Sequence, residues 1–506
     1  MGQQLCLSWL LLLVLTLLLA QLRWHRIGHW LLLGWLLLSG GLFLVELWLL
    51  LSYHSLLDGA MVQIALATNG REALEFISLR LRDMALAGLL FVLSVGIAWF
   101  LQRGLRQLLA WKHDLSVLLA VLLFFGGGWV QYKDPEVIEY CLSIERLSDM
   151  LYCLYDEMSS YDKISQGLAA QRIQLTYNES RIPYVVFILG ESTSRHHMGI
   201  YGYSLDTTPR LQRRQQAGEL RVFSDTISPH TYTMAVLREL FSFYHKEYGG
   251  EWYDYPDYFD ILRQAGYHTV WLSNQESSGI YGNAGRAYAD RCDAKAFTQI
   301  RDSQNPVSRL DEAILPLLDD SLADHAAEKN FYVLHLMGTH EDYVRRYPGS
   351  FAVFTSEDEA GDKPEWRKIR AEYDNAVRYN DFIVDEIIRR FEDKNAVVIY
   401  VSDHGEEVYD RWGFRGHAEH GSYYQLEIPM LVWTSPAFES AFPRLSGRLW
   451  AAVHQPFMTN DMIDLLMDLM ELQTQEYDSS RSPLQPDYDA GRPRLYEGST
   501  YKRTAE

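Results

Sequence analysis

The apolar residues of this 506-residue chain are crowded into its first 131 positions, and this uneven distribution constrains the fold most strongly. Crossing the hydrocarbon core of a bilayer as a helix takes about 20 consecutive apolar residues. Four runs approach that length. We therefore predict a transmembrane α-helical domain over residues 1–131, with helices at 5–22, 30–53, 84–101 and 115–131 and an external loop at 54–83.

Basic residues in the short loops predict how this domain is oriented. Arg23 and Arg26 follow the first run, and Arg103, Arg106 and Lys112 follow the third. Because Lys and Arg concentrate in cytoplasmic loops, both loops are expected in the cytoplasm. With four spans, everything after residue 131 then lies outside, which in a bacterium with two membranes is the periplasm.

Two features of the apolar half admit a second interpretation. The first run could be a cleaved signal peptide, but it lacks a basic segment in front and a second long run follows at once. Glu46 lies inside the second run, where an acidic side chain is either functional or reaches the lipid headgroups.

Charge and cysteine content exclude some classes of protein. The formal net charge is −20, which argues against binding nucleic acid because phosphates would be repelled. The spacings of the four cysteines match no zinc knuckle and no redox motif. Cys6 begins an apolar run, and the others allow at most one disulfide bridge: Cys141, Cys153 and Cys292.

The remaining residues alternate between strand and helix patterns. After a tyrosine-rich helical linker at 132–180, short apolar runs typical of buried parallel strands occur at 184–189, 269–272, 331–336, 396–401 and 429–433, with helical patterns at 234–243 and 366–391. This order predicts an α/β domain over 181–473 in which a mostly parallel sheet is sandwiched by helices. The 474–506 extension, rich in Asp, Ser, Pro, Arg and Tyr, is expected to be poorly ordered.

Polar residues directly after these strands are the first candidates for a site. Glu191 follows the run at 184–189, His340 the run at 331–336, and the Asp403-His404 pair the run at 396–401. Ligands bind beyond the carboxyl ends of the strands in such sheets. Carboxylates and imidazoles are ligands that zinc accepts, so the pattern predicts a zinc site at this edge.

A hydroxyl at the start of the helix pattern at 234–243 is the candidate nucleophile. The segment Ser228–Met234 offers Thr231 and Thr233, although a threonine there could simply cap the helix. Amide groups and the helix dipole would favour negative charge on the hydroxyl oxygen and on a phosphate. His417 and His420 follow the Asp-His pair closely enough to reach the same site, or they are solvated loop residues.

Several motifs in one order resemble a known family. They are FILGESTSRHHMGIYGY (187–203), SPHTYT (228–233), WLSNQ (271–275), HLMGTH (335–340), YDNAVRYND (373–381) and VSDHGEE (401–407). Together they closely resemble the bacterial phosphoethanolamine transferases of the alkaline phosphatase and sulfatase superfamily, and they span most of the catalytic domain. MVQIALATNGREALEF (61–76) similarly resembles the periplasmic loop of that family.

The resemblance implies roles for individual residues. It implies zinc ligands at Glu191, Thr233, Asp403 and His404, with one or two zinc ions bound. Thr233 would be the nucleophile, with Thr231 as the nearby alternative. His340 and His417 match histidines that contact the phosphoryl group or a second zinc, with His420 as the fallback, and Asn274 and Gln275 fall where the family handles the ethanolamine headgroup.

The chain departs from the family pattern in two ways, which concern the expected acceptor and the number of membrane spans. Lipid A enzymes carry a cysteine pair flanking the nucleophile, where this chain has Pro229 and Glu239. This favours the branch that acts on core heptose or periplasmic sugars. The family commonly has five membrane spans, whereas four are counted here.

The resemblance implies a zinc-dependent transferase of the bacterial inner membrane with its catalytic domain in the periplasm. Phosphatidylethanolamine would be the donor, and a lipopolysaccharide core or other envelope glycan would be the acceptor. Membrane lipid would surround the transmembrane helices. A phosphoglycerol transferase and a non-catalytic membrane sensor or assembly protein are the alternatives. A sulfatase would need a C/S-x-P-x-R context, which is absent near 228–238.

Overall fold

The computed structural model of the chain divides into two compact units, an amino-terminal helical unit and an α/β domain. It describes residues 27–53, 81–109, 147–148, 151–152, 173–246, 249–276, 284–299, 310–324, 327–411, 413–417, 421–496 and 498–502.

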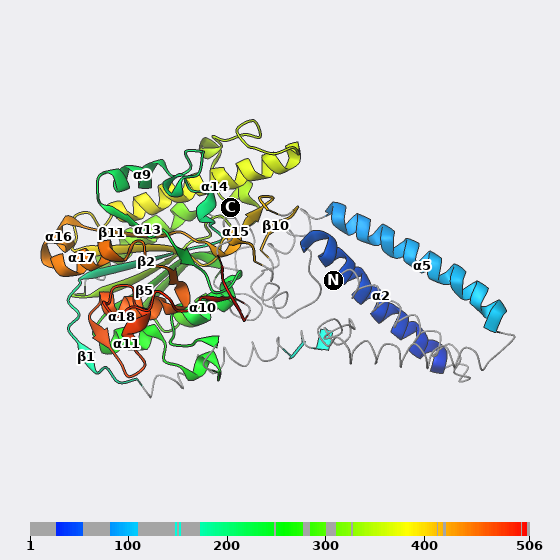
Figure 1. Cartoon of the computed structure of the whole chain (residues 1–506), viewed down its shortest axis with the longest axis horizontal. Coiled ribbons are helices and arrows are strands. Elements are labelled where there is room, and N and C mark those ends of the chain that lie inside the picture. The colour runs from blue at the N-terminus through cyan, green and yellow to red at the C-terminus, as the bar shows by residue number, and fades with distance from the viewer. Residues whose placement is uncertain are drawn as a thin grey trace. The chain divides into compact units, whose positions relative to one another are not determined.

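The amino-terminal unit contains two long helices at positions where spans are predicted. Helix α2 covers Ile27–Tyr53 and α5 covers Leu81–Leu109 (Figure 1). They contact each other through the rings of Phe43 and Phe91, whose centroids lie 6.3 Å apart. Glu46 is fully buried in this unit. Helices α2 and α5 thus cover the runs predicted at 30–53 and 84–101, whereas those at 5–22 and 115–131 lie outside the described residues.

Across the parts of the chain that the structure describes, no helix is both long enough and apolar enough to span a membrane.

The α/β domain is built on a seven-stranded sheet in the order β3-β11-β8-β2-β7-β5-β6. All neighbouring pairs from β8 to β6 are parallel, and only β11 runs against its two neighbours. The strands are β3 (Leu220–Val222), β11 (Met430–Thr434), β8 (Ala396–Ser402), β2 (Tyr184–Gly190), β7 (Asn330–His335), β5 (His268–Glu276) and β6 (Ala294–Gln299). The five predicted strands and the mostly parallel sheet are thereby confirmed.

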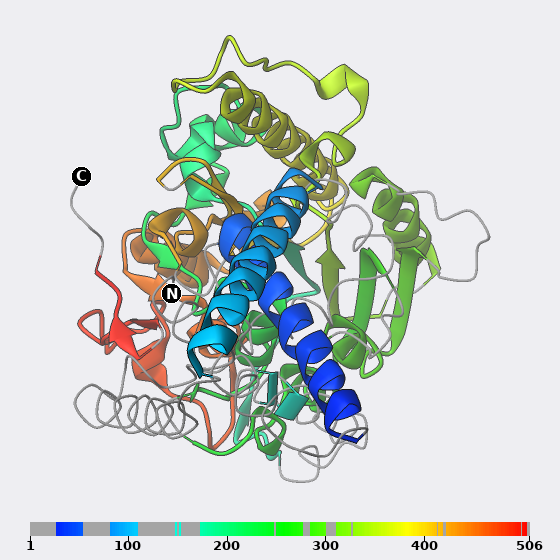
Figure 2. The same cartoon turned by 90° about the vertical axis from the view of Figure 1, so that its right-hand side faces the viewer.

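Alternating side chains of the strands feed two apolar layers. In β2, Val186 and Ile188 face one layer, whereas Val185, Phe187 and Leu189 face the other, as the period of two in a strand requires. The first layer is covered by α9 (Pro209–Gln216), α13 (Ile314–Asp324) and α14 (Pro364–Arg389), and α9 lies beside α14 in both Figures 1 and 2.

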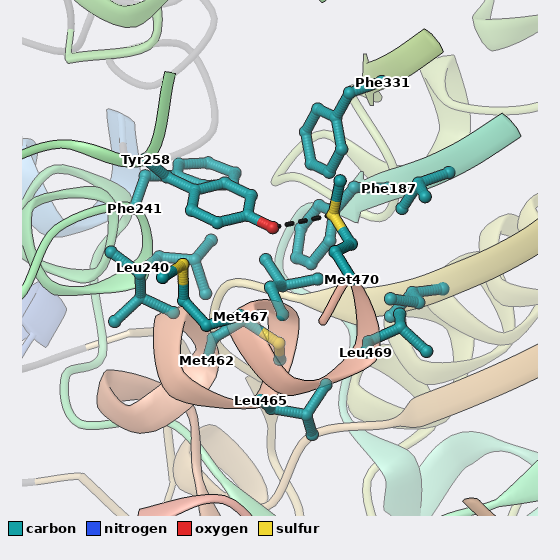
Figure 3. Close-up of a cluster of buried hydrophobic side chains, with 14 of the residues drawn as sticks. Phe187, Leu240, Phe241, Tyr258, Phe331, Met462, Leu465, Met467, Leu469 and Met470 are labelled. Carbon is teal, nitrogen blue, oxygen red and sulfur yellow. Dashed lines mark hydrogen bonds between the residues drawn. The ribbon is translucent and has the colours of Figure 1, made fainter. Parts of the chain in front are cut away.

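The opposite layer is covered by a second set of helices. They are α10 (Thr233–Leu240), α11 (Tyr258–Gln264), α12 (Ala284–Ala289), α16 (Pro436–Ala441), α17 (Pro443–Ala452) and α18 (Met462–Leu469). Figure 3 shows Met462, Met467 and Met470, from α18 and its carboxyl-terminal end, in the apolar cluster that includes Phe187, with the Tyr258 hydroxyl 2.8 Å from the Met470 sulfur. Helices on both faces give the sandwich that the sequence predicts.

Short pairings complete the domain. Strand β1 (Tyr177–Asn178) pairs with β13 (Leu472–Gln473), so the part of the predicted helical linker from 173 to 180 is not helical. The other short elements are β4 (Thr226–Ile227) with β12 (Phe457–Met458), β9 (Glu407–Val408) with β10 (Arg415–Gly416), β14 (Leu495–Tyr496) with β15 (Ser499–Thr500), and α15 (Tyr423–Leu426).

The carboxyl-terminal extension packs against the domain, so the expectation that it is poorly ordered is wrong for residues 474–496 and 498–502. Arg481 is buried and donates to Asp461 at 2.8 Å, and Arg492 pairs with the same carboxylate. Leu484 joins the apolar layer. Buried acids of the domain thus neutralise the basic residues that made this segment look solvent-exposed.

Removing Arg481 is expected to destabilise the α/β domain. Arg481→Ala leaves the buried Asp461 with one cation fewer, and breaking a buried ion pair costs about 3 kcal/mol. Arg389→Ala is the matched control, because Arg389 pairs with Glu386 at the surface and should change stability by about 0.5 kcal/mol or less. Urea unfolding followed by tryptophan fluorescence checks this, and equal losses in the two variants would contradict it.

Candidate active site

The candidate site lies where β8, β2 and β7 end side by side. Glu191 follows β2, Asp403 follows β8, and the Asp403 amide donates to the Gly190 carbonyl at 3.2 Å. The turn after β7 joins them, because the Thr339 amide donates to the Glu191 carbonyl at 3.0 Å. The prediction that polar residues after these three strands meet at one edge is confirmed.

Three buried side chains form the centre of this site. The Nε2 atom of His404 lies 3.4 Å from Oε1 of Glu191 and 3.5 Å from Oδ2 of Asp403. One ligand atom from each residue falls within 4.8 Å of the others, and the three residues are at most 2% exposed. Two carboxylates and an imidazole are thus gathered in a space almost closed to solvent.

The hydrogen bonds of His404 aim its other nitrogen at the carboxylates. Its Nδ1 lies 2.8 Å from the Gly405 carbonyl oxygen, which can only accept, so Nδ1 carries a proton. In the described part of the chain, neither Nε2 of His404 nor Oδ2 of Asp403 has a hydrogen-bond partner. A metal-binding histidine is oriented by such a backbone contact, and orphaned buried atoms of this kind fit zinc.

The pKa values show that this space attracts positive charge. Burial opposes charge on His404, but Asp403 and Glu191 raise the pKa of the ring to about 10. Burial and the charge of Glu191 raise the pKa of Asp403 to about 7, whereas His404 outweighs burial and holds the pKa of Glu191 well below its usual value. A cation among them would relieve the repulsion between the two acids.

Thr233 is the first residue of α10, and its hydroxyl joins this centre. Its Oγ1 donates to Oε2 of Glu191 at 3.0 Å, and its hydrogen bonding also lowers the pKa of Asp403. Thr231 is buried instead, and its methyl group lies so close to Gly421 that a Cβ there would be 2.7 Å away. Of the two candidate nucleophiles, the structure brings Thr233 to the acids.

Tight backbone packing holds the two acid-bearing turns together. Ser192 has a φ of 57°, and from this strained position its amide donates to Asp403 and its hydroxyl to Glu191. Gly338 has a φ of 52°, and a Cβ on it would lie 2.6 Å from the Glu191 carbonyl oxygen. Sequence analysis assigned no role to Ser192, although it directly follows Glu191.

The other predicted residues are placed at different distances from the centre. His340 lies close enough for its charge to lower the pKa of Glu191. Gln275 donates to Glu191 Oε2 at 3.2 Å, whereas fully buried Asn274 donates to Asp311 and accepts from Thr298. His420 lies outside the described residues.

His417 lies beside the centre with a partner that sequence reasoning missed. Its ring is 4.6 Å from the ring of His404, and its Nδ1 is 3.2 Å from Oε2 of the buried Glu406. His404, Glu406 and His417 form a second group with ligand atoms within 4.8 Å. Tyr373 of α14 was also missed, and its hydroxyl holds the backbone of Ser192 and Ser194.

A third group of potential ligands lies away from this edge. It comprises His245, Asp461 and Asp464. Arg481 and Arg492 already neutralise Asp461, and burial together with these two cations lowers the pKa of His245 to about 3. Guanidinium groups therefore take the role that a metal ion would have there.

Comparison with protein families agrees with this geometry. A model of the sulfatase family matches residues 183–472, which is more than half of the chain and includes every described residue of the candidate site. The chain belongs to the sulfatase family. A second model, described as phosphoethanolamine transferase EptA/EptB, matches residues 11–137 of the amino-terminal part.

Individual relatives are similar to different shares of this sulfatase-family chain. The phosphoethanolamine transferase EptC of Escherichia coli O18:K1:H7 is 29% identical over 65% of the chain, and the match covers 57% of EptC itself. The phosphoethanolamine transferase CptA of Salmonella typhimurium is 26% identical over 87% of the chain and 79% of CptA. The chain thus spans little more than half of EptC but most of CptA.

Solved structures of relatives share the fold. The periplasmic domain of Escherichia coli EptC, crystallised with zinc, is 29% identical, with a TM-score of 0.59 over 66% of this chain and 94% of that one. The integral membrane protein EptA of Neisseria meningitidis is 23% identical, with a TM-score of 0.63 over 88% of this chain and 86% of that one. The sulfatase-like α/β fold is therefore established.

A buried ionic network joins the turn after β2 to the segment that carries His417. His197 lies 2.6 Å from Asp374 of α14 through Nδ1 and 3.1 Å from Asp410 through Nε2. Burial opposes charge on this ring, but the two acids raise its pKa to about 10. His197 is therefore a charged link that fixes Asp410, seven residues before His417.

This network predicts a loss of stability in alkaline solution. Because the folded pKa of His197 is raised above 6.5, its stabilisation is complete below pH 6.5 and is lost as pH rises through about 10. The free energy of unfolding should therefore fall across that window, and less steeply in His197→Gln. Part of the decrease in unfolding free energy with pH should remain in His197→Gln, because burial and Asp374 raise the pKa of Glu359 to about 8. Equal slopes in both proteins would contradict the assignment.

Proposed function

We propose that this chain is a zinc-dependent transferase that moves phosphoethanolamine from phosphatidylethanolamine to an envelope glycan or lipopolysaccharide acceptor. The observation that carries the proposal is the 3.0 Å hydrogen bond from Thr233 to Glu191, within a buried Glu-Asp-His centre at the start of α10. The named activities of EptC and CptA support the chemistry.

The proposed metal ligands are Glu191, Thr233, Asp403 and His404. Bound there, zinc would lower the pKa of the Thr233 hydroxyl and neutralise charge on the phosphate oxygens. The zinc complex of the EptC domain supports this ligand set by analogy. Because a second group of potential metal ligands lies around His417, we propose that one or two zinc ions bind.

In the proposed first half-reaction, the Thr233 oxygen attacks the phosphorus of the donor lipid. A bond forms between Thr233 and phosphorus, the bond to the diacylglycerol oxygen breaks, and phosphoethanolamine stays on the threonine. Amides at the start of α10 stabilise the charge of the phosphate, and the adjacent His340 and His417 are placed to bind it or to transfer protons.

In the proposed second half-reaction, an acceptor hydroxyl attacks the same phosphorus and Thr233 leaves. Gln275 contacts Glu191 and is the better placed of the two residues proposed for the ethanolamine headgroup. We expect core heptose or a periplasmic sugar as acceptor, on the sequence departures at Pro229 and Glu239.

The proposed donor is a membrane lipid, so an enzyme that uses it must reach a membrane. We propose that the helices before residue 131 hold the chain in the bacterial inner membrane, with the catalytic domain in the periplasm. The match of residues 11–137 to the EptA/EptB model and the likeness to the integral membrane protein EptA support this placement.

Covalent capture tests the reaction and the nucleophile together. Wild-type protein incubated with phosphatidylethanolamine should gain the mass of one phosphoethanolamine group, measured by intact-mass spectrometry, because the Thr233 hydroxyl is in contact with the Glu191 carboxylate. Thr233→Ala should gain none, and Thr231→Ala should still gain it. An adduct on Thr233→Ala would move the nucleophile, and an adduct only with phosphatidylglycerol would establish phosphoglycerol transfer instead.

Zinc binding tests the centre without requiring activity. After treatment with a chelator, calorimetric titration of Asp403→Asn with zinc should show affinity at least about 100-fold below wild type, because a ligand is lost. Asp464→Asn is the matched control and should bind zinc as wild type does, since Asp464 belongs to the group neutralised by arginines. Unchanged affinity in Asp403→Asn would refute the ligand set.

A further inference from the structure

Glu406 is a buried carboxylate whose two oxygens are both engaged by named partners. It is 0% exposed, its Oε1 accepts from the Tyr343 hydroxyl at 2.8 Å, and its Oε2 lies 3.2 Å from Nδ1 of His417. Tyr343 is itself buried. The carboxylate therefore has a fixed orientation and presents one oxygen to the histidine.

This contact settles which nitrogen of His417 is free to act. The contact with Glu406 occupies Nδ1 of His417, so Nε2 is the ring nitrogen left for other partners. The His417 side chain is 17% exposed, whereas Glu406 is inaccessible, and the ring lies 4.6 Å from that of His404. A buried acid behind a partly accessible histidine is an arrangement that orients general acid–base groups.

We propose that Glu406 is a positioning residue that acts through His417, holding the ring so that Nε2 of His417 is the nitrogen left to contact the substrates. This inference rests on the proposed function. Tyr343 completes the chain by fixing the second oxygen of Glu406.

A double-mutant cycle on the full-length chain tests whether Glu406 acts through His417. Single-turnover rates of adduct formation with phosphatidylethanolamine, and of adduct loss to an acceptor sugar, are measured by intact mass. Glu406→Gln should slow both steps by about 10- to 100-fold without changing binding to phosphatidylethanolamine vesicles. His417→Ala should slow them by about 100-fold or more, and adding Glu406→Gln to it should cost nothing further.

Glu407→Gln is the matched control. Glu407 is the neighbouring residue and equally buried, but it accepts from Ser422 and from the Arg411 amide. It should retain nearly the wild-type rates, and its thermal midpoint shows what the same substitution does to folding. An equal slowing in Glu407→Gln would overturn the proposal, as would additive losses in the double mutant.

Two further outcomes separate the possible failures. If Glu406→Gln binds one zinc ion fewer than wild type in calorimetric titration, Glu406 is a ligand in a second metal site and the positioning role is overturned. If wild type forms an adduct and Glu406→Gln matches its rates, only this inference fails. If wild type forms no adduct, the proposed function fails and takes the inference with it.

Discussion

Mutual repulsion between two buried carboxylates is the constraint on which the rest of this site depends. Glu191 and Asp403 are held within reach of one imidazole nitrogen, and each is at most 2% exposed. Such a pair survives burial only when fixed donors and positive charge surround it. The strained backbone at Ser192, the lack of a side chain at Gly338 and the inward-facing hydroxyl of Thr233 all serve that requirement.

Polar contacts from distant parts of the sequence hold the turns of the site in place. Helix α14 contributes Tyr373 to the turn after β2 and Asp374 to the His197 network. The nucleophile segment is tied to its own helix by a contact of 2.9 Å between His230 and Glu239. This contact links the segment before α10 to the helix itself without a covalent bond.

Sequence analysis predicted the strands and the grouping of polar residues, which depend on local residue patterns. It missed the side-chain contacts that depend on the tertiary fold. Apolar runs located the strands, and because parallel strands end at one edge, Glu191, Asp403 and His404 could be grouped in advance. Neighbouring residues on a strand face opposite ways, so Asn274 and Gln275 could not both reach the centre. The role of Glu406 depends on Tyr343 and His417, which adjacency cannot reveal. The membrane spans, the acceptor and the ligand roles stay predictions.

The packed extension has a consequence for the order in which this protein matures. Tyr496 accepts a hydrogen bond from the Gly421 amide, beside Thr231, and Tyr501 contacts Glu427, which also binds Arg195 and His196 in the turn after β2. Ribosomes make residues 494–501 after every other part of this neighbourhood. The turns around the candidate site therefore lack these contacts until residues 494–501 have been made, and a chain truncated before this segment would lack them altogether.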